Sequence, residues 1–272
     1  MAGMQKFYTQ IHSGGMLYST MLSLMRNPKW IDVLSDVGLD FLSIDMEHTP
    51  YSWSEVSGLL TMMNARSMPS ILRIPRPDWH YVTKAFDAGA SGVLAPYCET
   101  VDEVRTIIQA SRLRPFKASL AEKAIQTGHY PSEAVQAHLE ENNDSHIVMI
   151  GIESVPAVEN LDAILDIGGI DVVFIGPADL STSIGYPRDW DHPEFVAMCD
   201  HIITTCKARN VQVAANFAPL EQSAKWAARG INVVIHAFDW RVLHEGYQHV
   251  METLRTAAGD TSTKISGTDA VI

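Results

Sequence analysis

The chain has 272 residues, with 20 Lys and Arg against 32 Asp and Glu, and a formal net charge of -12. This length allows one large domain or two small ones, and a hydrophobic content of 46% excludes wholesale disorder. The acidic balance, without a Lys- or Arg-rich run, argues against nucleic acid or an anionic membrane surface as a partner. No stretch reaches the ~20 apolar residues that a membrane-spanning helix needs.

The amino-terminal residues and the cysteines indicate the cellular compartment in which the protein is expected. Residues 1–8 lack a basic region followed by an apolar run, so no signal peptide is expected. Cys98, Cys199 and Cys206 form no Cys-x-x-Cys pair and no even-numbered disulfide framework. We therefore expect buried, reduced cysteines in a cytoplasmic protein.

Short apolar runs alternate with longer segments of helical spacing along the chain. The expected strands are 16–20, 41–44, 70–74, 92–95, 147–152, 172–175, 211–215 and 233–236. The expected helices include 30–37, 53–64, 79–88, 101–111, 193–209 and 220–229. Apolar strands without polar alternation indicate a parallel sheet covered by helices on both faces. Eight of them predict a closed (β/α)8 TIM barrel, and the lack of a Gly-x-Gly-x-x-Gly motif after the first strand disfavours a dinucleotide-binding sheet.

Two segments fall outside this repeat. Residues 115–145 form a long insert that is expected to hold a short helix at 132–141, and long inserts on the C-terminal side of a barrel often shape the substrate pocket. Residues 257–272 are rich in Thr, Ser, Gly and Asp, which is typical of a flexible polar tail. The prediction is a single barrel over residues 1–256 followed by this tail.

Polar residues gather at the ends of five expected strands. The strands end in Asp45-Met46-Glu47-His48, in Arg73, in Glu153, in Gly176-Pro177-Ala178-Asp179 and in His236. Because the active site of a (β/α)8 barrel lies at the C-terminal ends of its strands, we expect these side chains on one rim.

Glu153 and Asp179 are the candidate metal ligands, because Mg²⁺ and Mn²⁺ usually take one or two protein carboxylates and leave room for water and substrate. The alternative is that each carboxylate caps a helix or pairs with a surface cation. Arg73 lies in an otherwise apolar strand, so it must face an anion, either a barrel carboxylate or a developing oxyanion. The tight turn at 176–179 can cradle a carboxylate with its N–H groups.

His48 is the candidate general base, since the flanking Asp45 and Glu47 can fix its tautomer and raise its basicity. Asp87, in the helix after the third strand, is the other candidate partner, although its position also suits a solvated acid near a helix end. His236 is expected to be a packed histidine rather than an added polar contact.

Together these residues resemble the class II pyruvate aldolases of the HpcH/HpaI aldolase family, relatives of the citrate lyase beta subunit. The resemblance covers about residues 14–256, and the matching motifs are Asp45-x-Glu47-His48, Arg73, Asp87-Ala-Gly89, Ile152-Glu153 and Gly176-Pro-Ala-Asp179-Leu-Ser181. It implies a (β/α)8 barrel that assembles as a homohexamer, commonly a trimer of dimers. It also implies reversible cleavage of a 4-hydroxy-2-oxo acid, such as 4-hydroxy-2-oxoheptanedioate, to pyruvate and an aldehyde.

The resemblance further implies how the substrate is held. Glu153 and Asp179 would bind a divalent Mg²⁺, Mn²⁺ or Co²⁺ ion that pyruvate chelates and that acts as a Lewis acid on the enolate. The pyruvate carboxylate would bind the amides of Ala178 and Asp179 in the turn that Gly176 and Pro177 begin.

The resemblance also implies roles in proton transfer. His48, paired with Asp87, would act as the acid and base on the aldol hydroxyl, and Arg73 would stabilise the developing enolate charge. Asp45, with Glu47 beside it, would lie behind the metal ligands and orient a metal-bound water.

The chain departs from the family pattern at two places. Gly151 stands where many members carry a Gln, two residues before the metal-binding Glu. Residues 113–120 replace a Tyr-Pro-Pro-x-Gly-x-Arg-Gly stretch whose Arg can recognise a distal carboxylate on the aldehyde, and that position falls near Ser119. Arg114 and Lys117 are the candidate replacements for this cation.

Two alternatives stay open at this point. The first is a citrate-synthase-like condensing enzyme that uses an acetyl-CoA enolate, which a CoA dependence would reveal. The second is a non-catalytic keto-acid-binding barrel, for which the altered segment 115–145 is the support.

Overall fold

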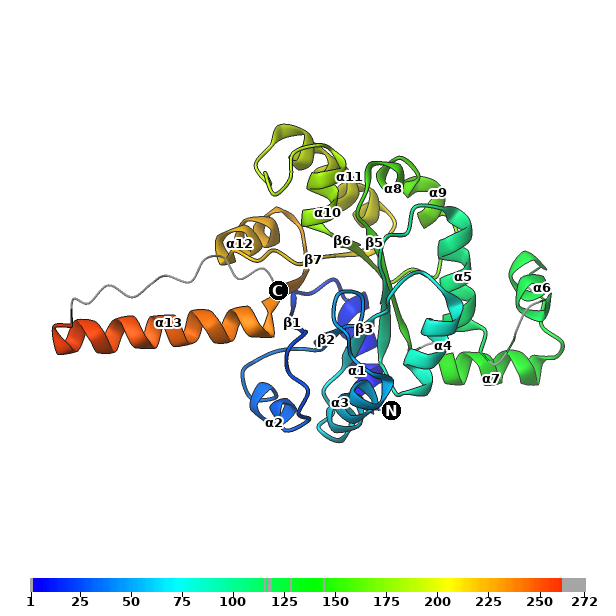
Figure 1. The fold of residues 1–272 in the computed structure, drawn as a ribbon. Helices are drawn as coiled ribbons and strands as arrows, with labels where there is room; N and C mark the ends of the chain where they lie inside the picture. The colour runs from blue at the N-terminus through cyan, green and yellow to red at the C-terminus, as the bar shows by residue number, and fades with distance from the viewer. Residues whose placement is uncertain (1, 115, 117–118, 128, 144, 261–272) are drawn as a thin grey trace.

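The structure is a computed structural model that describes residues 2–114, 116, 119–127, 129–143 and 145–260. Eight parallel strands pair in sequence order, and β8 pairs with β1, so the sheet closes into a barrel (Figure 1). The strands are β1 (Leu17–Leu22), β2 (Leu42–Asp45), β3 (Ser70–Arg73), β4 (Gly92–Ala95), β5 (Ile147–Ile152), β6 (Val172–Ile175), β7 (Gln212–Ala215) and β8 (Val233–Phe238). The predicted (β/α)8 barrel is confirmed.

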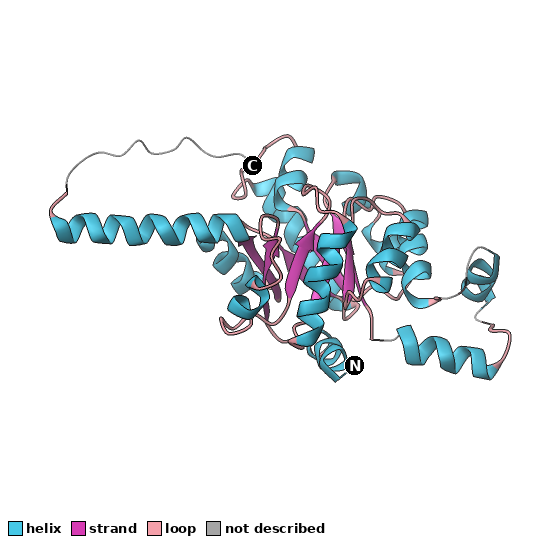
Figure 2. Ribbon diagram, turned by 60° about the horizontal axis from the view of Figure 1, so that its bottom comes forward, coloured by secondary structure: helices cyan, strands magenta, loops and turns pink. Residues whose placement is uncertain are grey.

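Helices surround the sheet (Figure 2). They are α1 (Ala2–His12), α2 (Trp30–Leu34), α3 (Trp53–Ala65), α4 (Trp79–Asp87), α5 (Val101–Arg112), α6 (Ser119–Thr127), α7 (Glu133–Asn143), α8 (Val155–Glu159), α9 (Leu161–Leu165), α10 (Pro177–Ser183), α11 (Pro193–Ala208), α12 (Leu220–Arg229) and α13 (Asp239–Ala258). Their starts follow from local chemistry. Ser52 and Thr100, for example, begin α3 and α5 with capping boxes to Glu55 and Glu103.

Side chains along each strand alternate between the barrel interior and the surrounding helices, as the two-residue period of a strand requires. On β5, Met149 belongs to the apolar cluster that fills the barrel, whereas Ile150 packs in the cluster between sheet and helices. Continuing this alternation, Gly151 and Glu153 face inward. The strand ends therefore deliver every second residue to the barrel axis.

Helix α1, which the sequence analysis did not predict, closes the amino-terminal end of the barrel. Its Phe7 and Ile11 are buried in the cluster that fills the barrel. The Phe7 ring centroid lies 5.2 Å from that of Phe41. One end of the barrel is therefore sealed by apolar packing.

The insert at 115–145 projects from the barrel and holds two helices (Figure 1). Helix α7 confirms the helix predicted at 132–141, whereas α6 was not predicted. The insert connects the end of α5 to the start of β5, so it lies at the amino-terminal ends of the strands. The expectation that it borders the substrate pocket is wrong for a single chain, because the rim of polar residues forms at the other end.

Helix α13 extends away from the barrel (Figures 1 and 2). It runs to Ala258, so it includes the first residues of the predicted tail, and residues 261–272 lie outside the described part of the chain. Within the described ranges, no helix combines the length and apolarity that a bilayer crossing demands.

Candidate active site

The carboxyl ends of β2, β3, β5 and β6 bring the predicted site residues, except Asp87, to one rim. Asp45, Arg73 and Glu153 are the inward residues at the ends of their strands, and all three are buried. Asp179 lies in the first turn of α10 and is exposed on the rim. A parallel barrel places all strand ends of one polarity together, so these residues meet although they are far apart in sequence.

Arg73 is held by two carboxylates from β2 and the turn after it. Its Nε lies 2.9 Å from Asp45 Oδ1 and its Nη2 2.8 Å from Asp45 Oδ2, while Nη1 lies 3.1 Å from Glu47 Oε2. Burial by itself would lower the pKa of Arg73, but Asp45 and Glu47 outweigh burial and raise it. The Arg73 guanidinium is therefore charged, and its orientation is fixed. The sequence predicted a barrel carboxylate as one possible partner of Arg73, and Asp45 is that carboxylate.

Asp45 also organises the turn that carries Glu47 and His48. Its Oδ1 accepts hydrogen bonds from the amides of Glu47 at 2.9 Å and His48 at 3.3 Å. Burial opposes ionisation of Asp45, but Arg73 and these amides hold its pKa below the ordinary value. Asp45 is therefore the anchor of the Asp45-Met46-Glu47-His48 turn.

Glu153 is a buried carboxylate without a neutralising partner of its own. It is 2% exposed, and its Oε1 makes no hydrogen bond. Burial and the charge of Glu47 raise the pKa of Glu153 to about 8, with Arg73 acting in the opposite direction. Such a group is stabilised either by a proton or by a nearby cation.

Two glycines make the space in which the Glu153 carboxylate sits. A Cβ on Gly151 would lie 2.8 Å from Glu153 Oε1, and a Cβ on Gly176 would lie 2.8 Å from Glu153 Cδ. Within the described residues, no three His, Cys, Asp or Glu side chains converge on a metal-binding point. Two carboxylates that leave room for water and substrate oxygens fit the sparse protein donor set that Mg²⁺ and Mn²⁺ accept.

The turn at 176–179 begins α10 and presents free backbone donors. Pro177 is the first helical residue and has no N–H, and Gly176 caps the helix without a side-chain hydrogen bond. The amides of Ala178 and Asp179 therefore have no intrahelical acceptor, as in the first turn of any α-helix. They can bind an anion beside Glu153.

His48 stands at the open rim. Its side chain is 64% exposed, and its Nε2 lies 3.6 Å from Glu47 Oε2. Asp87, the other predicted partner, is the last residue of α4, which runs back toward the amino-terminal ends of the strands, and there it pairs with Arg114. Within one chain, Asp87 thus does not reach His48, and their pairing stays a prediction.

Arg114, the one proposed replacement cation that lies within the described residues, is away from the rim. Arg114 is engaged by Asp87 at the amino-terminal end, and Ser119 begins α6 in the projecting insert. Lys117 lies outside the described residues. Among the described residues of segment 113–120, no cation reaches the rim in a single chain.

Sequence comparison identifies the family. The HpcH/HpaI aldolase/citrate lyase family model matches residues 19–243. The chain belongs to this family. It is 30% identical to a 2-keto-3-deoxy-L-rhamnonate aldolase of Salmonella gallinarum, over 97% of this chain and 96% of that one. It is 31% identical to the enzyme of the same name from Klebsiella pneumoniae, over 74% of this chain and 76% of that one.

Solved structures agree with the HpcH/HpaI assignment. An HpcH/HpaI aldolase from Desulfitobacterium hafniense superposes with a TM-score of 0.78 at 25% identity, over 91% of this chain and 95% of that one. Citrate synthase SbnG superposes with a TM-score of 0.76 at 25% identity, over 93% of this chain and 97% of that one. The chain is an enzyme of the aldolase and lyase class, as the motifs predicted.

Two further predictions are confirmed in this HpcH/HpaI barrel. His236 faces outward to α12, where its Nδ1 lies 3.0 Å from Ser223 Oγ, so it is a packed histidine and not a rim residue. Burial lowers its pKa. The three cysteines are free thiols, and all are buried.

Asp239 and Tyr97 are rim residues that the sequence analysis missed. Asp239 begins α13 and accepts hydrogen bonds from the amides of Ser23, Leu24 and Met25 in the loop after β1. An acid directly after a strand and before a long helix is the signal that could have found it. Tyr97 follows β4 and has a φ of 53°, a conformation that its residue type does not predict.

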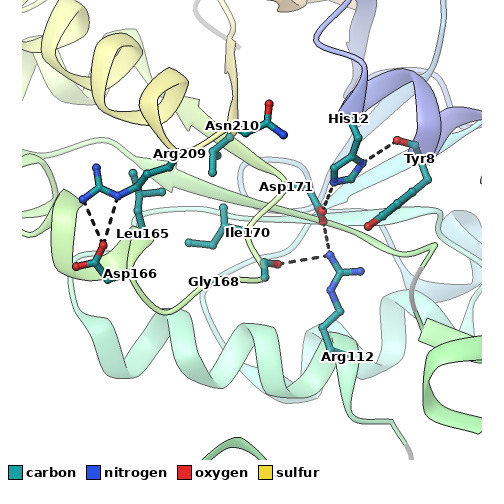
Figure 3. Close-up of a pocket in the computed structure, with 12 residues that line it drawn as sticks. Tyr8, His12, Arg112, Leu165, Asp166, Gly168, Ile170, Asp171, Arg209 and Asn210 are labelled. Atoms are coloured by element: carbon teal, nitrogen blue, oxygen red, sulfur yellow. Dashed lines mark hydrogen bonds and ion pairs between the residues drawn. The ribbon is translucent and has the colours of Figure 1, made fainter. Parts of the chain in front are cut away.

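A cavity lies at the opposite end from this rim. It has a volume of about 470 Å³ and is bordered by Tyr8, His12, Arg112, Leu165, Asp166, Gly168, Gly169, Ile170, Asp171, Arg209, Asn210 and Val211 (Figure 3). Its charged groups pair with one another, His12 and Arg112 with Asp171, and Arg209 with Asp166. These pairs join α1, α5 and the start of β6, so the cavity marks a structural junction rather than the catalytic centre.

Proposed function

We propose that this chain is a divalent-metal-dependent aldolase that reversibly cleaves a 4-hydroxy-2-oxo acid to pyruvate and an aldehyde. The observation that carries the proposal is the buried Glu153 carboxylate, which has an unpaired oxygen and packs against Gly176, the residue before the helical turn that carries Asp179. This site stabilises a cation more readily than an isolated carboxylate does. The 2-keto-3-deoxy-L-rhamnonate aldolase relatives support the same reaction type.

Glu153 and Asp179 are the proposed ligands of Mg²⁺, Mn²⁺ or Co²⁺. When bound there, the metal supplies Lewis acidity that stabilises the enolate of pyruvate. The chain's part is to place the keto acid, whose carboxylate binds the amides of Ala178 and Asp179 at the start of α10. Gly151 and Gly176 keep this space clear of side-chain atoms.

Arg73 and His48 are the proposed groups that handle charge and protons. Arg73 is aimed by Asp45 and Glu47, so its positive charge is in place before negative charge develops on the substrate. His48, open to solvent on the rim, removes the proton of the aldol hydroxyl in cleavage and returns it in condensation. Asp87 stays a predicted partner of His48.

Retro-aldol assays with chelator test the proposal. Pyruvate release from 4-hydroxy-2-oxo acids is expected to stop with EDTA and to return with Mg²⁺, Mn²⁺ or Co²⁺, and Glu153→Gln is expected to abolish calorimetric Mn²⁺ binding. Glu159→Gln, on the exposed end of α8, is the control and should bind Mn²⁺ normally. Full activity of a metal-free preparation contradicts the proposal.

A His48→Ala variant tests the proton transfer. Its turnover is expected to fall by ~10²–10⁴, the usual contribution of an acid–base group. Mn²⁺ affinity should be unchanged, because His48 is not among the proposed ligands. Wild-type turnover in this variant would remove His48 from the mechanism.

The likeness to citrate synthase SbnG favours a second candidate, condensation of an acetyl-CoA-derived enolate with a keto acid. A dependence of product formation on a CoA thioester distinguishes it, because the aldolase reaction needs none.

The proposal also includes a homohexamer, supported by exposed apolar side chains on α13, and a cytoplasmic location, supported by three free thiols.

A further inference from the structure

Asp239, the first residue of α13, is a buried carboxylate that holds the loop after β1. Figure 1 shows the start of α13 beside β1, and Asp239 is 3% exposed there. Its Oδ1 accepts hydrogen bonds from the amides of Ser23 and Leu24, each at 3.1 Å, and from the Ser23 hydroxyl. Its Oδ2 accepts from the amides of Leu24 at 3.0 Å and Met25 at 2.8 Å. Because charge strengthens each of these bonds, one side chain fixes three consecutive residues of the loop.

The same loop is bonded to the segment that follows His48. Tyr51 Oη donates a hydrogen bond to Met25 O at 2.8 Å, and Tyr51 is buried. The amide of Tyr51 donates to Thr49 O at 2.8 Å, so Tyr51 closes the short segment that begins after His48. Met25 is therefore held through its amide by Asp239 and through its carbonyl by Tyr51.

Arg26, the next residue of the loop, packs on the Tyr51 ring. Its guanidinium carbon lies 4.6 Å from the ring centroid, and its Nε lies 3.2 Å from Glu55 Oε1. Glu55 completes the capping box of α3 with Ser52, the residue directly after Tyr51. The orientation of the ring is thus set from both the loop and α3, so its hydroxyl points to one acceptor.

His48 lies in a turn that is held from both ends. Asp45 holds the amino-terminal side, through the amides of Glu47 and His48. Tyr51 holds the carboxyl-terminal side, through the loop after β1. The His48 side chain itself is 64% exposed, so the backbone of this turn determines where the imidazole stands. A general base needs such placement, because it must lie within hydrogen-bond reach of the proton that it removes.

We propose that Asp239 and Tyr51 are positioning residues that act in series, through the loop after β1, on the turn that carries His48. This inference rests on the proposed role of His48 in aldol cleavage. The proposed metal ligands follow β5 and β6, on the opposite side of the closed ring from β1 and β2. Loss of either positioning residue therefore impairs proton transfer and leaves the binding of metal and pyruvate intact.

Tyr51→Phe is the mildest test, because it removes the hydroxyl and keeps the ring. In pyruvate release from 4-hydroxy-2-oxopentanoate by the Mn²⁺-loaded enzyme, kcat is expected to fall about tenfold with KM nearly unchanged. Calorimetry should show wild-type affinity for Mn²⁺ and for oxalate, which reports the pyruvate half of the site. Tyr81→Phe, half-buried on α4 with its ring stacked on Trp53, is the control and should keep the wild-type kcat. A wild-type kcat or weakened oxalate binding in Tyr51→Phe overturns the proposal.

A double-mutant cycle tests whether the two residues act in series. Asp239→Asn replaces one acceptor oxygen by an NH₂ group that faces the loop amides, so its kcat is also expected to fall about tenfold. The double variant with Tyr51→Phe should lose about tenfold rather than ~100-fold, because both changes break one link. Asp78→Asn is the control, since Asp78 caps α4 by accepting from the amide of His80 at 2.9 Å and should not affect kcat. Losses that multiply in the double variant overturn the series link.

Amide hydrogen exchange tests the network without catalysis. In Tyr51→Phe, peptides covering residues 46–51 are expected to exchange faster than in wild type, whereas those of β5 should be unchanged. Unchanged exchange at 46–51, or faster exchange throughout the chain, overturns the positioning role and leaves the aldolase standing. A wild type that binds neither Mn²⁺ nor oxalate overturns the aldolase itself, and with it the catalytic role of this network.

Discussion

At the residue scale, the site depends on how each buried charge is compensated. Arg73 and Asp45 form a nearly enclosed ion pair, with 8% and 1% of their side chains exposed, and both sides gain hydrogen bonds. Glu153 is buried equally deeply, but no cation is dedicated to it. The Arg73–Asp45 pair is thus a preformed scaffold. Glu153 is instead the carboxylate that an added cation would stabilise most.

Asp45→Asn tests the scaffold. The asparagine leaves Arg73 buried without a full counter-charge, so the free energy of unfolding is expected to fall by about 3–5 kcal/mol. Urea denaturation measures this loss. Asp102→Asn provides the control, because Asp102 pairs with Arg105 at 89% exposure and should barely change stability. Equal effects of both variants would show that burial does not decide the strength of the pair.

At the element scale, the barrel helices begin where side chains satisfy their first amides. Ser52 caps α3 by accepting from the amide of Glu55, and Glu55 in turn accepts from the amide of Ser52 at 2.7 Å. This hydrogen bonding lowers the pKa of Glu55. The start of α3 matches its predicted start at Trp53, because a capping box is a signal carried by adjacent residues.

Ser52→Ala measures the value of this cap. Loss of the Ser52 hydroxyl is expected to lower the free energy of unfolding by about 1 kcal/mol. Ser57→Ala, at an exposed position inside the same helix, should be neutral or slightly stabilising because Ala has the higher helix propensity. Thermal unfolding of both variants measures these changes in stability. A greater loss of stability in Ser57→Ala than in Ser52→Ala would contradict the capping argument.

At the scale of the whole molecule, α1 is joined to the barrel by a titratable contact. His12 Nε2 lies 3.0 Å from Asp171 Oδ1, and this hydrogen bond raises the pKa of His12 (Figure 3). A raised pKa means that the stabilisation is complete below pH ~6.5 and disappears as the pH rises through the pKa of the folded state. The amino-terminal end of the barrel is therefore expected to be held more tightly in mild acid.

His12→Ala tests this linkage. Its destabilisation relative to wild type is expected to be about 1 kcal/mol at pH ~5.5 and to become smaller toward pH ~8.5, as wild-type His12 loses its proton. Urea unfolding at the two pH values gives both differences. His249→Ala, exposed on α13, should show no such pH dependence. A difference for His12→Ala that does not change with pH would exclude the charged contact.

The proposed assembly is also a property of the whole molecule. Helix α13 exposes an apolar stripe with helical spacing, made of Val242, Leu243, Tyr247, Val250, Met251 and Leu254. Tyr247→Glu combined with Met251→Glu is expected to lower the mass measured by light scattering, because charges are costly in an apolar interface. Thr253→Glu, exposed on the same helix, should keep the wild-type mass. An unchanged mass in the double variant would show that α13 makes no interface.

Local apolar runs and motifs of adjacent residues were enough to predict the strands, the barrel, the family and the rim positions of Asp45, Arg73, Glu153 and Asp179. Strands β4, β5 and β6, for example, have the predicted bounds. Only the tertiary structure decided which residues meet. Asp87 belongs to a strand-to-helix motif, but α4 runs against the strands and carries it to the far end of the barrel.

Tertiary packing also explains why His236 lies off the rim and why Tyr97 was not predicted to lie on it. The two-residue alternation of β8 turns His236 outward, and the phase of that alternation is set by packing rather than by residue type. The left-handed turn at Tyr97 precedes the buried Cys98, whose amide donates to Gly151 O on β5, and that is a contact between separate strands. Contacts of that kind appear only once the barrel has closed.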